Sequence, residues 1–213
     1  MAIQGAARTH AVSGMRACET GTDGGVYTLR TAVGGVEVIV GPGEVLALAG
    51  AGSRTALTAA AAAERIGDVA FDGLSMSRAA ELRRRVIGTT TTDHRLVPSL
   101  TVLGNVALPL ELDGWNRGAA REAAHEALGL VDLAHRADLF PDDLSAARRR
   151  AVALARGVVG GRLLVLSDEP LDVLHVTLLR RLAANGSAVL ARTTALVRPT
   201  WADRLVVVPA AHL

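Results

Sequence analysis

Short apolar runs alternate with helical patterns along the chain from Val36 to Val208. Short β-branched or aliphatic runs predict strands, and apolar residues three or four positions apart predict helices. The predicted strands are Val36–Val40, Val45–Ala49, Ile66–Asp72, Val86–Thr90, Leu163–Leu166, Ala188–Ala191 and Arg204–Val208. The predicted helices are Ala56–Arg65, Ser77–Arg85, Ala146–Val158 and Val173–Ala184, with a mostly helical stretch from Thr101 to Leu139. This alternating order predicts an α/β fold with a mostly parallel sheet.

Two parts of this pattern are especially informative. The unbroken apolar run Leu163–Leu166 is typical of a parallel strand buried on both faces. The segment Pro141–Ser145 offers turn residues and an N-cap directly before the helix at Ala146. Because the chain length suits one α/β core, we expect a single domain over residues 1–213, with a helical subdomain at about residues 101–158.

Composition narrows the class of protein. The chain has 213 residues and a formal net charge of only +2, so a nucleic-acid groove is not indicated. Cys18 is the only cysteine, which excludes an intrachain disulfide and a cysteine-cluster metal site. The N-terminal residues lack an apolar signal core, and no apolar run approaches the roughly 20 residues of a spanning helix. We therefore expect a cytoplasmic protein that does not itself cross a membrane.

A colinear series of short motifs resembles the ATP-binding subunits of ABC transporters, nearest to the lipoprotein-release and macrolide-export type. The matching segments are Gly43–Leu48, Val69–Gly73, Ile87–Gly88, Leu96–Val106, Leu144–Ser145, Val152–Arg156, Asp168–Pro170 and Ala202–Arg204. Each segment alone is a weak signal, but their order over most of the chain makes chance similarity improbable. The resemblance implies a P-loop NTPase-like cassette with ATP and Mg²⁺ as cofactors. It also implies a membrane permease and a second ATPase subunit as partners, in a homo- or heterodimer, and a peripheral location at the inner face of the cell membrane.

The segment Gly50–Thr55 stands where the resemblance places the phosphate loop. Such a loop needs glycines so that backbone N–H groups converge on an anion, a lysine for the phosphates and a hydroxyl for Mg²⁺. The candidate residues here are Gly50, Gly52, Ser53, Arg54 and Thr55. Only three residues separate Gly50 from Arg54, so the loop is two residues shorter than the G-x-x-x-x-G-K pattern. Arg54 is not a conservative replacement for the lysine, and a plain strand-to-helix turn is the alternative.

Three further residues are candidates for the site. The resemblance assigns Asp168 to Mg²⁺ through water and Glu169 to polarising the attacking water; an acidic pair that caps a helix is the alternative. Ser145 lies in the segment Leu144–Arg148, which stands in place of the family's L-S-G-G-Q motif. Its hydroxyl and the helix N-terminus behind it suit a phosphate, whereas the neighbouring run Arg148–Arg150 also fits a solvated helix face.

Several reactive parts of the family are missing. The chain has no lysine, so all 23 basic residues are arginine. Thr92 stands near the place of the metal-contacting glutamine, and Arg192–Thr194 stands where a histidine is expected. Tyr27 is the only aromatic near the place of the adenine-stacking residue, with strand packing as the alternative. Asp172 is a candidate remnant of the loop that crosses the family's dimer interface. We expect the histidines to be structural or exposed, because they show no metal-ligand spacing.

These replacements predict a cassette subunit with impaired or lost ATP hydrolysis that supports a transporter beside a competent ATPase subunit. Losing one charge-stabilising donor typically costs about 10²–10³ in rate, and here the lysine, glutamine and histidine are all replaced. Two alternatives stay open. One is an active ABC transporter ATPase with a divergent phosphate loop; the other is a nucleotide-independent interaction protein on a cassette fold.

Overall fold

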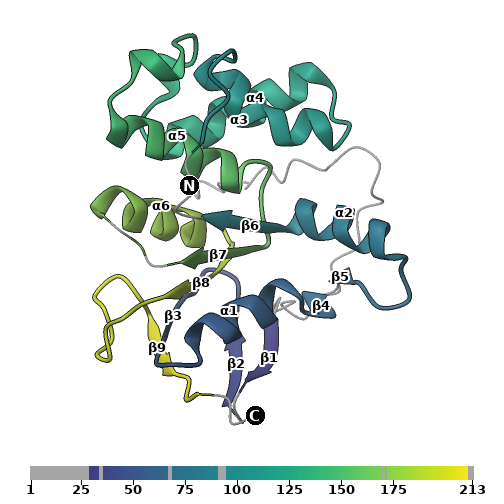
Figure 1. The fold of residues 1–213 in the computed structure, drawn as a ribbon, viewed down its shortest axis with the longest axis vertical. Coiled ribbons are helices and arrows are strands. Elements are labelled where there is room, and N and C mark those ends of the chain that lie inside the picture. The colour runs from purple at the N-terminus through teal and green to yellow at the C-terminus, as the bar shows by residue number, and fades with distance from the viewer. Residues whose placement is uncertain are drawn as a thin grey trace, which may run out of the picture.

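The computed structural model describes residues 29–33, 36–66, 69–90, 95–168, 170 and 172–210 (Figure 1). Its central sheet has five strands in the order β6-β7-β8-β3-β9. These strands are β3 (Val45–Ala49), β6 (Ile87–Thr90), β7 (Leu164–Asp168), β8 (Ala188–Arg192) and β9 (Arg204–Val207). The four strand pairings of this sheet are all parallel. The predicted α/β fold with a mostly parallel sheet is therefore confirmed.

Two small antiparallel pairs flank the central sheet. β1 (Leu29–Val33) pairs with β2 (Val36–Val40), and β4 (Arg65–Ile66) pairs with β5 (Val69–Ala70). The single strand predicted at Ile66–Asp72 is wrong, because Arg65 pairs with Ala70 and the chain reverses inside that segment. The sequence pattern also missed β1.

Six α-helices are described, together with two short 3₁₀ helices at Ala134–Arg136 and Pro141–Asp143. The α-helices are α1 (Ser53–Ala61), α2 (Met76–Val86), α3 (Val102–Leu112), α4 (Arg117–Leu130), α5 (Ala146–Val158) and α6 (Val173–Ala184). The predicted bounds of α5 and α6 are confirmed. The prediction for α1 is wrong at both ends, since the helix starts directly after Gly52 and Arg65 belongs to β4. Among the described residues, no helix has the length and apolar character needed to span a membrane.

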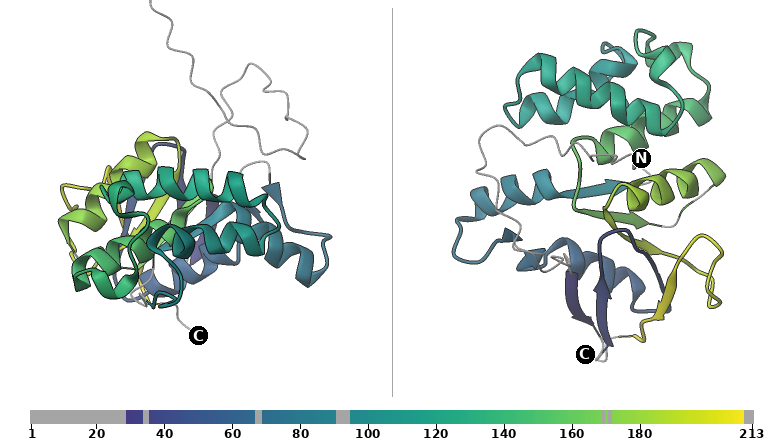
Figure 2. Two further views of the ribbon diagram at one scale, coloured as in Figure 1. Left: turned by 90° about the horizontal axis from the view of Figure 1, so that it is seen from above. Right: turned by 180° about the vertical axis from the view of Figure 1, so that it is seen from behind.

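The central sheet separates two hydrophobic cores. Along β7, Val165 packs into the core shared with α3, α4, α5 and α6, while Leu164 and Leu166 pack into the core shared with α1 and α2. This alternation confirms that the apolar run of β7 is buried on both faces. Helices α3, α4 and α5 form a layer at one end of the molecule, which is clear in the views of Figures 1 and 2.

Candidate functional site

The loop after β3 packs closely against the chain that follows β9. Gly50 has φ of +86°, and a Cβ atom there would lie 2.5 Å from the carbonyl oxygen of Val208. A Cβ atom at Gly52 would lie 2.1 Å from the carbonyl oxygen of Pro209. Both glycines are therefore required by local packing, because any side chain would collide with backbone.

Two backbone donors of this loop are already paired inside the protein. The N–H of Gly52 donates to the carbonyl oxygen of Val208 at 3.0 Å, and the N–H of Ser53 donates to that of Gly50 at 3.1 Å. Ser53 is buried, whereas the side chains of Arg54 and Thr55 are exposed. A phosphate cradle depends on convergent free N–H groups, so the shortened loop offers fewer donors to an anion than the resemblance implies.

Asp168, at the end of β7, lies between two guanidinium groups. Nε of Arg192 donates to Oδ1 of Asp168, and Nη1 of Arg54 lies 3.7 Å from Oδ2. The Arg192 side chain is 15% exposed and that of Arg54 is 72% exposed. Each carboxylate oxygen thus faces a positive charge that belongs to the protein.

The strand order explains this arrangement. Asp168 and Arg192 are direct neighbours in the parallel pairing of β7 with β8. β8 also pairs with β3, whose loop carries Arg54 into the first turn of α1. The carboxyl end of the sheet therefore brings Asp168, Arg192 and Arg54 together. Arg192 was identified only as part of the segment that stands where a histidine is expected, although a charged residue at the end of a buried strand signals a nearby partner.

These residues do not fit the Mg²⁺ site that the resemblance implies. A divalent cation at Asp168 would have to displace or approach two resident cations, which like-charge repulsion opposes. Within the described part of the chain, no group of three or more His, Cys, Asp or Glu side chains is placed to hold a metal ion. Glu169 lies outside the described residues, as do Thr92 and Tyr27.

Ser145 is exposed at the N-terminus of α5, where its Oγ accepts a hydrogen bond from the N–H of Arg148 at 3.4 Å. Figure 1 shows α5 and α1 well apart. The structure therefore does not bring Ser145 into one site with Arg54.

Asp172 and Thr193 have structural contacts. Oδ1 of Asp172 accepts from the N–H of His175 at 2.8 Å, and Oδ2 lies 3.2 Å from Nη1 of Arg150. Thr193, near the place of the expected histidine, is buried, and its N–H donates to Leu48 at 2.8 Å. His175 is buried as well, with Nε2 2.9 Å from Oγ1 of Thr90. Its role is structural, in keeping with the expectation for the histidines.

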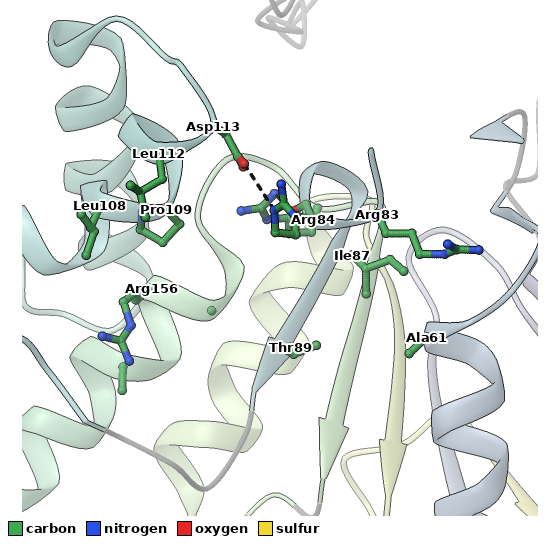
Figure 3. Close-up of a pocket in the computed structure, with 13 residues that line it drawn as sticks. Ala61, Arg83, Arg84, Ile87, Thr89, Leu108, Pro109, Leu112, Asp113 and Arg156 are labelled. Carbon is green, nitrogen blue, oxygen red and sulfur yellow. Dashed lines mark hydrogen bonds and ion pairs between the residues drawn. The ribbon is translucent and has the colours of Figure 1, made fainter. Parts of the chain in front are cut away.

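A second surface feature lies beside the edge strand β6. A groove of about 620 Å³ lies between α2, β6, α3 and α5. Figure 3 shows residues that line it. Its apolar lining includes Leu108, Pro109 and Leu112, and its basic lining includes Arg84 and three further arginines at positions 83, 156 and 162. Leu112 is 79% exposed, and Nε of Arg84 lies 3.6 Å from an oxygen of Asp113. The groove therefore combines an apolar wall with a basic one.

Comparison with known proteins gives a consistent family assignment. The chain is 40% identical over 136 residues to the methionine import ATP-binding protein MetN of Symbiobacterium thermophilum, which covers 61% of this chain and 41% of that protein. It is 46% identical over 98 residues to the lipoprotein-releasing system ATP-binding protein LolD of Bordetella pertussis, covering 46% and 42%. The chain thus spans about two fifths of the length of these two relatives. It is also 31% identical to the cell division ATP-binding protein FtsE of Streptococcus pneumoniae, covering 76% of this chain and 78% of that protein.

The fold has close counterparts among solved structures. The dimeric structure of a bacterial ABC transporter cassette superposes with a TM-score of 0.61 at 24% identity, covering 87% of this chain and 92% of that one. The family model described as "ABC transporter" matches residues 33–172, which include the loop after β3, Ser145 and Asp168. This match extends over more than half of the sequence, and the chain therefore belongs to the ABC transporter family.

Proposed function

We propose that this protein is the ATP-binding-cassette subunit of a membrane transporter, with impaired or lost hydrolysis at its own nucleotide site, and that it acts beside a competent ATPase subunit. The observation that carries this proposal is the position of Asp168 between Arg54 and Arg192. The residue that the resemblance assigns to Mg²⁺ is already neutralised by resident charges. Because one lost charge-stabilising group typically costs about 10²–10³ in rate, we propose that turnover is negligible.

Phosphate release by the purified chain, supplied with ATP and Mg²⁺, tests this function. We expect no turnover above that of the Asp168→Asn variant. Turnover of about 1 s⁻¹ or faster, typical of enzymes, that disappears in the Glu169→Gln variant would overturn the proposal. It would favour an active ATPase with a divergent loop instead.

The groove beside β6 supports a permease partner. Its exposed Leu112 and its arginines suit a protein segment that presents both apolar and acidic side chains. The segment Leu96–Val106 leads into α3, which forms one wall of the groove, and it resembles the family region where a permease helix docks. We accordingly propose a cytoplasmic location at the inner face of the cell membrane, held there by the permease. The similarity to LolD supports a transporter of the lipoprotein-release type.

A second cassette subunit is the other proposed partner. The solved relative described above is a dimer, and the resemblance implies that each phosphate loop is closed by the serine-containing segment of the opposite subunit. Ser145 is exposed at a helix N-terminus, where a hydroxyl and the helix dipole favour an anion. We propose that Ser145 faces the ATP of a competent partner, while the site at Asp168 does little hydrolysis.

A further inference from the structure

We propose that Arg84 determines which partner the groove beside β6 accepts, by binding a carboxylate on a helical segment whose neighbouring apolar side chain packs on Leu112. This inference rests on the proposed function, because it names the chemistry of the permease segment that the groove would hold. It makes a separate claim, since a groove can also bind a partner through its apolar wall alone.

The arginines that line the groove differ in how firmly they are bound to the rest of the fold. Nη2 of Arg83 donates to the carbonyl oxygen of Ala63 at 3.1 Å, and its Cζ lies 4.5 Å from the centre of the Phe71 ring. Arg162 is 6% exposed, and its Nη1 donates to two carbonyl oxygens in the last turn of α2. Arg156 also interacts within the protein. Arg83 and Arg162 are therefore engaged with the ends of helices.

Arg84 is held less firmly. Its side chain is 62% exposed, and its Nε lies 3.6 Å from Oδ1 of Asp113, which is beyond hydrogen-bond distance (Figure 3). Glu81, one turn earlier in α2, lies 2.8 Å from both Arg78 and Arg85, so its carboxylate is already paired. The planar guanidinium of Arg84 can therefore bind a further carboxylate through two parallel hydrogen bonds.

Asp113 orients Arg84 and does not depend on it alone for charge compensation. The Asp113 side chain is only 7% exposed and lies at the C-terminal end of α3. Burial lowers the pKa of Arg162, and the charge of Asp113 opposes this shift, so the two side chains are within electrostatic reach of each other. Asp113 thus keeps a cationic neighbour when Arg84 turns toward a partner. The cost of leaving a buried charge uncompensated is avoided.

The walls of the groove favour a bound helix over an added strand. The N–H of Ile87 in β6 donates to the carbonyl oxygen of Arg83, and the carbonyl oxygen of Thr89 packs against Gly157 of α5. These backbone groups of β6 are therefore not free to pair with another strand. Leu112, in the last turn of α3, is 79% exposed. A helix can present a carboxylate and an apolar side chain on one face, at positions three or four residues apart.

The experiment is binding of a labelled synthetic peptide to the full chain, followed by fluorescence anisotropy at low ionic strength because salt screens ion pairs. The peptide is alanine-based and helical, with glutamate and leucine four residues apart; a second peptide has glutamine in place of glutamate. We expect the glutamate peptide to bind more tightly. Arg84→Ala should weaken its binding about fivefold, the upper range for an exposed ion pair, and remove the difference between the peptides. The matched control is Arg78→Ala, which removes a 61% exposed guanidinium from the same helix and should leave both affinities unchanged.

Charge reversal at Arg84 gives the sharpest contrast. Arg84→Glu should reject the glutamate peptide and prefer a peptide with lysine at that position, whereas Leu112→Ala should weaken all of these peptides alike. Arg84→Lys keeps the charge without the planar fork, so its affinity should lie between those of the wild type and Arg84→Ala.

Two results would overturn the inference. Equal affinities of the wild type for the glutamate and glutamine peptides would show that Arg84 does not select the partner, while an apolar contact with a permease would still stand. Absence of binding by both peptides would overturn the inference as well. Either result leaves the proposed loss of hydrolysis standing, since phosphate release judges that claim separately.

Discussion

Asp172 connects two helices through its two carboxylate oxygens. Oδ1 caps α6 by accepting the N–H of His175, and Oδ2 pairs with Arg150 of α5. The hydrogen bond from the His175 backbone contributes most to lowering the pKa of Asp172 below its ordinary 3.8, and Arg150 lowers it further, although burial opposes both. A carboxyl with a lowered pKa stabilises the fold at pH values above its unfolded pKa, and this contribution is lost as the pH falls through the folded pKa.

The Asp172→Asn variant tests this contribution. Asparagine can still cap the helix, but it cannot carry the charge. We expect the wild type to be more stable than the variant at pH 7, and the difference to shrink to zero as the pH falls below the lowered pKa. Urea unfolding at a series of pH values measures this, with Asp138→Asn as a control at an exposed aspartate of the helical layer. If the difference in stability between the wild type and Asp172→Asn stayed the same at acidic pH, the charge of Asp172 would not contribute to stability. Asp172→Ala should cost about 1 kcal/mol through loss of the cap.

The sequence predicted individual residues of the site, but it did not predict which residues they contact in the fold. Asp168 was identified because it follows a buried apolar strand. Its ion pair with Arg192 depends on β7 and β8 lying side by side in register, and a single sequence does not contain the strand order. The packing of Gly50 and Gly52 against Val208 and Pro209 was missed for the same reason, since β9 is more than 150 residues further along the chain.

Among the elements, α5 packs closely against β6 beside the groove. A Cβ atom at Gly157 of α5 would lie 2.2 Å from the carbonyl oxygen of Thr89 in β6. Gly157→Ala should therefore force the helix and strand apart and destabilise the protein by roughly 1–3 kcal/mol. The matched control is Gly129→Ala in α4, where a Cβ atom would meet nothing within 4 Å. There, alanine should stabilise the helix by up to about 1 kcal/mol.

Urea unfolding of both variants measures the difference between the two helical glycines. Equal stability of Gly157→Ala and Gly129→Ala would show that α5 and β6 are not held in contact as described. Gly157 is itself one of the residues that line the groove. The Gly157→Ala substitution should therefore change the shape of the groove as well as the stability of the protein.

The starts of α5 and α6 were predictable because a polar side chain caps each of these helices. Ser145 and Asp172 accept hydrogen bonds at the starts of α5 and α6, and both helices begin where the sequence predicted. α1 has no side-chain cap, and its run of alanines gives no end signal, so helix propensity alone placed it three residues late. The hairpin of β4 and β5 was missed because the Gly67-Asp68 pair, a typical hairpin signal in sequence, was included in one continuous strand.

At the scale of the molecule, the two hydrophobic cores lie on opposite faces of the same central sheet. Val45, Val165 and Val189 join the helical layer to one face, and Leu46, Leu164 and Leu190 pack with α1 and α2 on the other. Alternate residues of the same strands thus belong to different cores. We propose on this basis that residues 1–213 form one domain, in which the helical layer does not unfold independently of the sheet.

Tryptophan fluorescence provides a probe of one core alone. The chain has two tryptophans, and both Trp115 and Trp201 pack against the core that contains the helical layer. Leu46 is fully buried in the opposite core. Leu46→Ala should cost about 2–5 kcal/mol through lost burial and the cavity it leaves. If the two cores unfold together, the midpoint seen by fluorescence should fall by about 2–4 °C for each kcal/mol lost.

The control for this test is Leu112→Ala, at a leucine that is 79% exposed, where the change should stay within about 0.5 kcal/mol. Far-ultraviolet circular dichroism follows the helices and strands of the whole chain, so its midpoint should fall together with that of fluorescence in Leu46→Ala. A fluorescence midpoint that stays at the wild-type value, while the dichroism signal splits into two transitions, would show that the helical layer is a separate domain. Shared strands argue against that outcome, because removing Leu46 disturbs β3, whose neighbouring residue Val45 packs directly into the core that the tryptophans report.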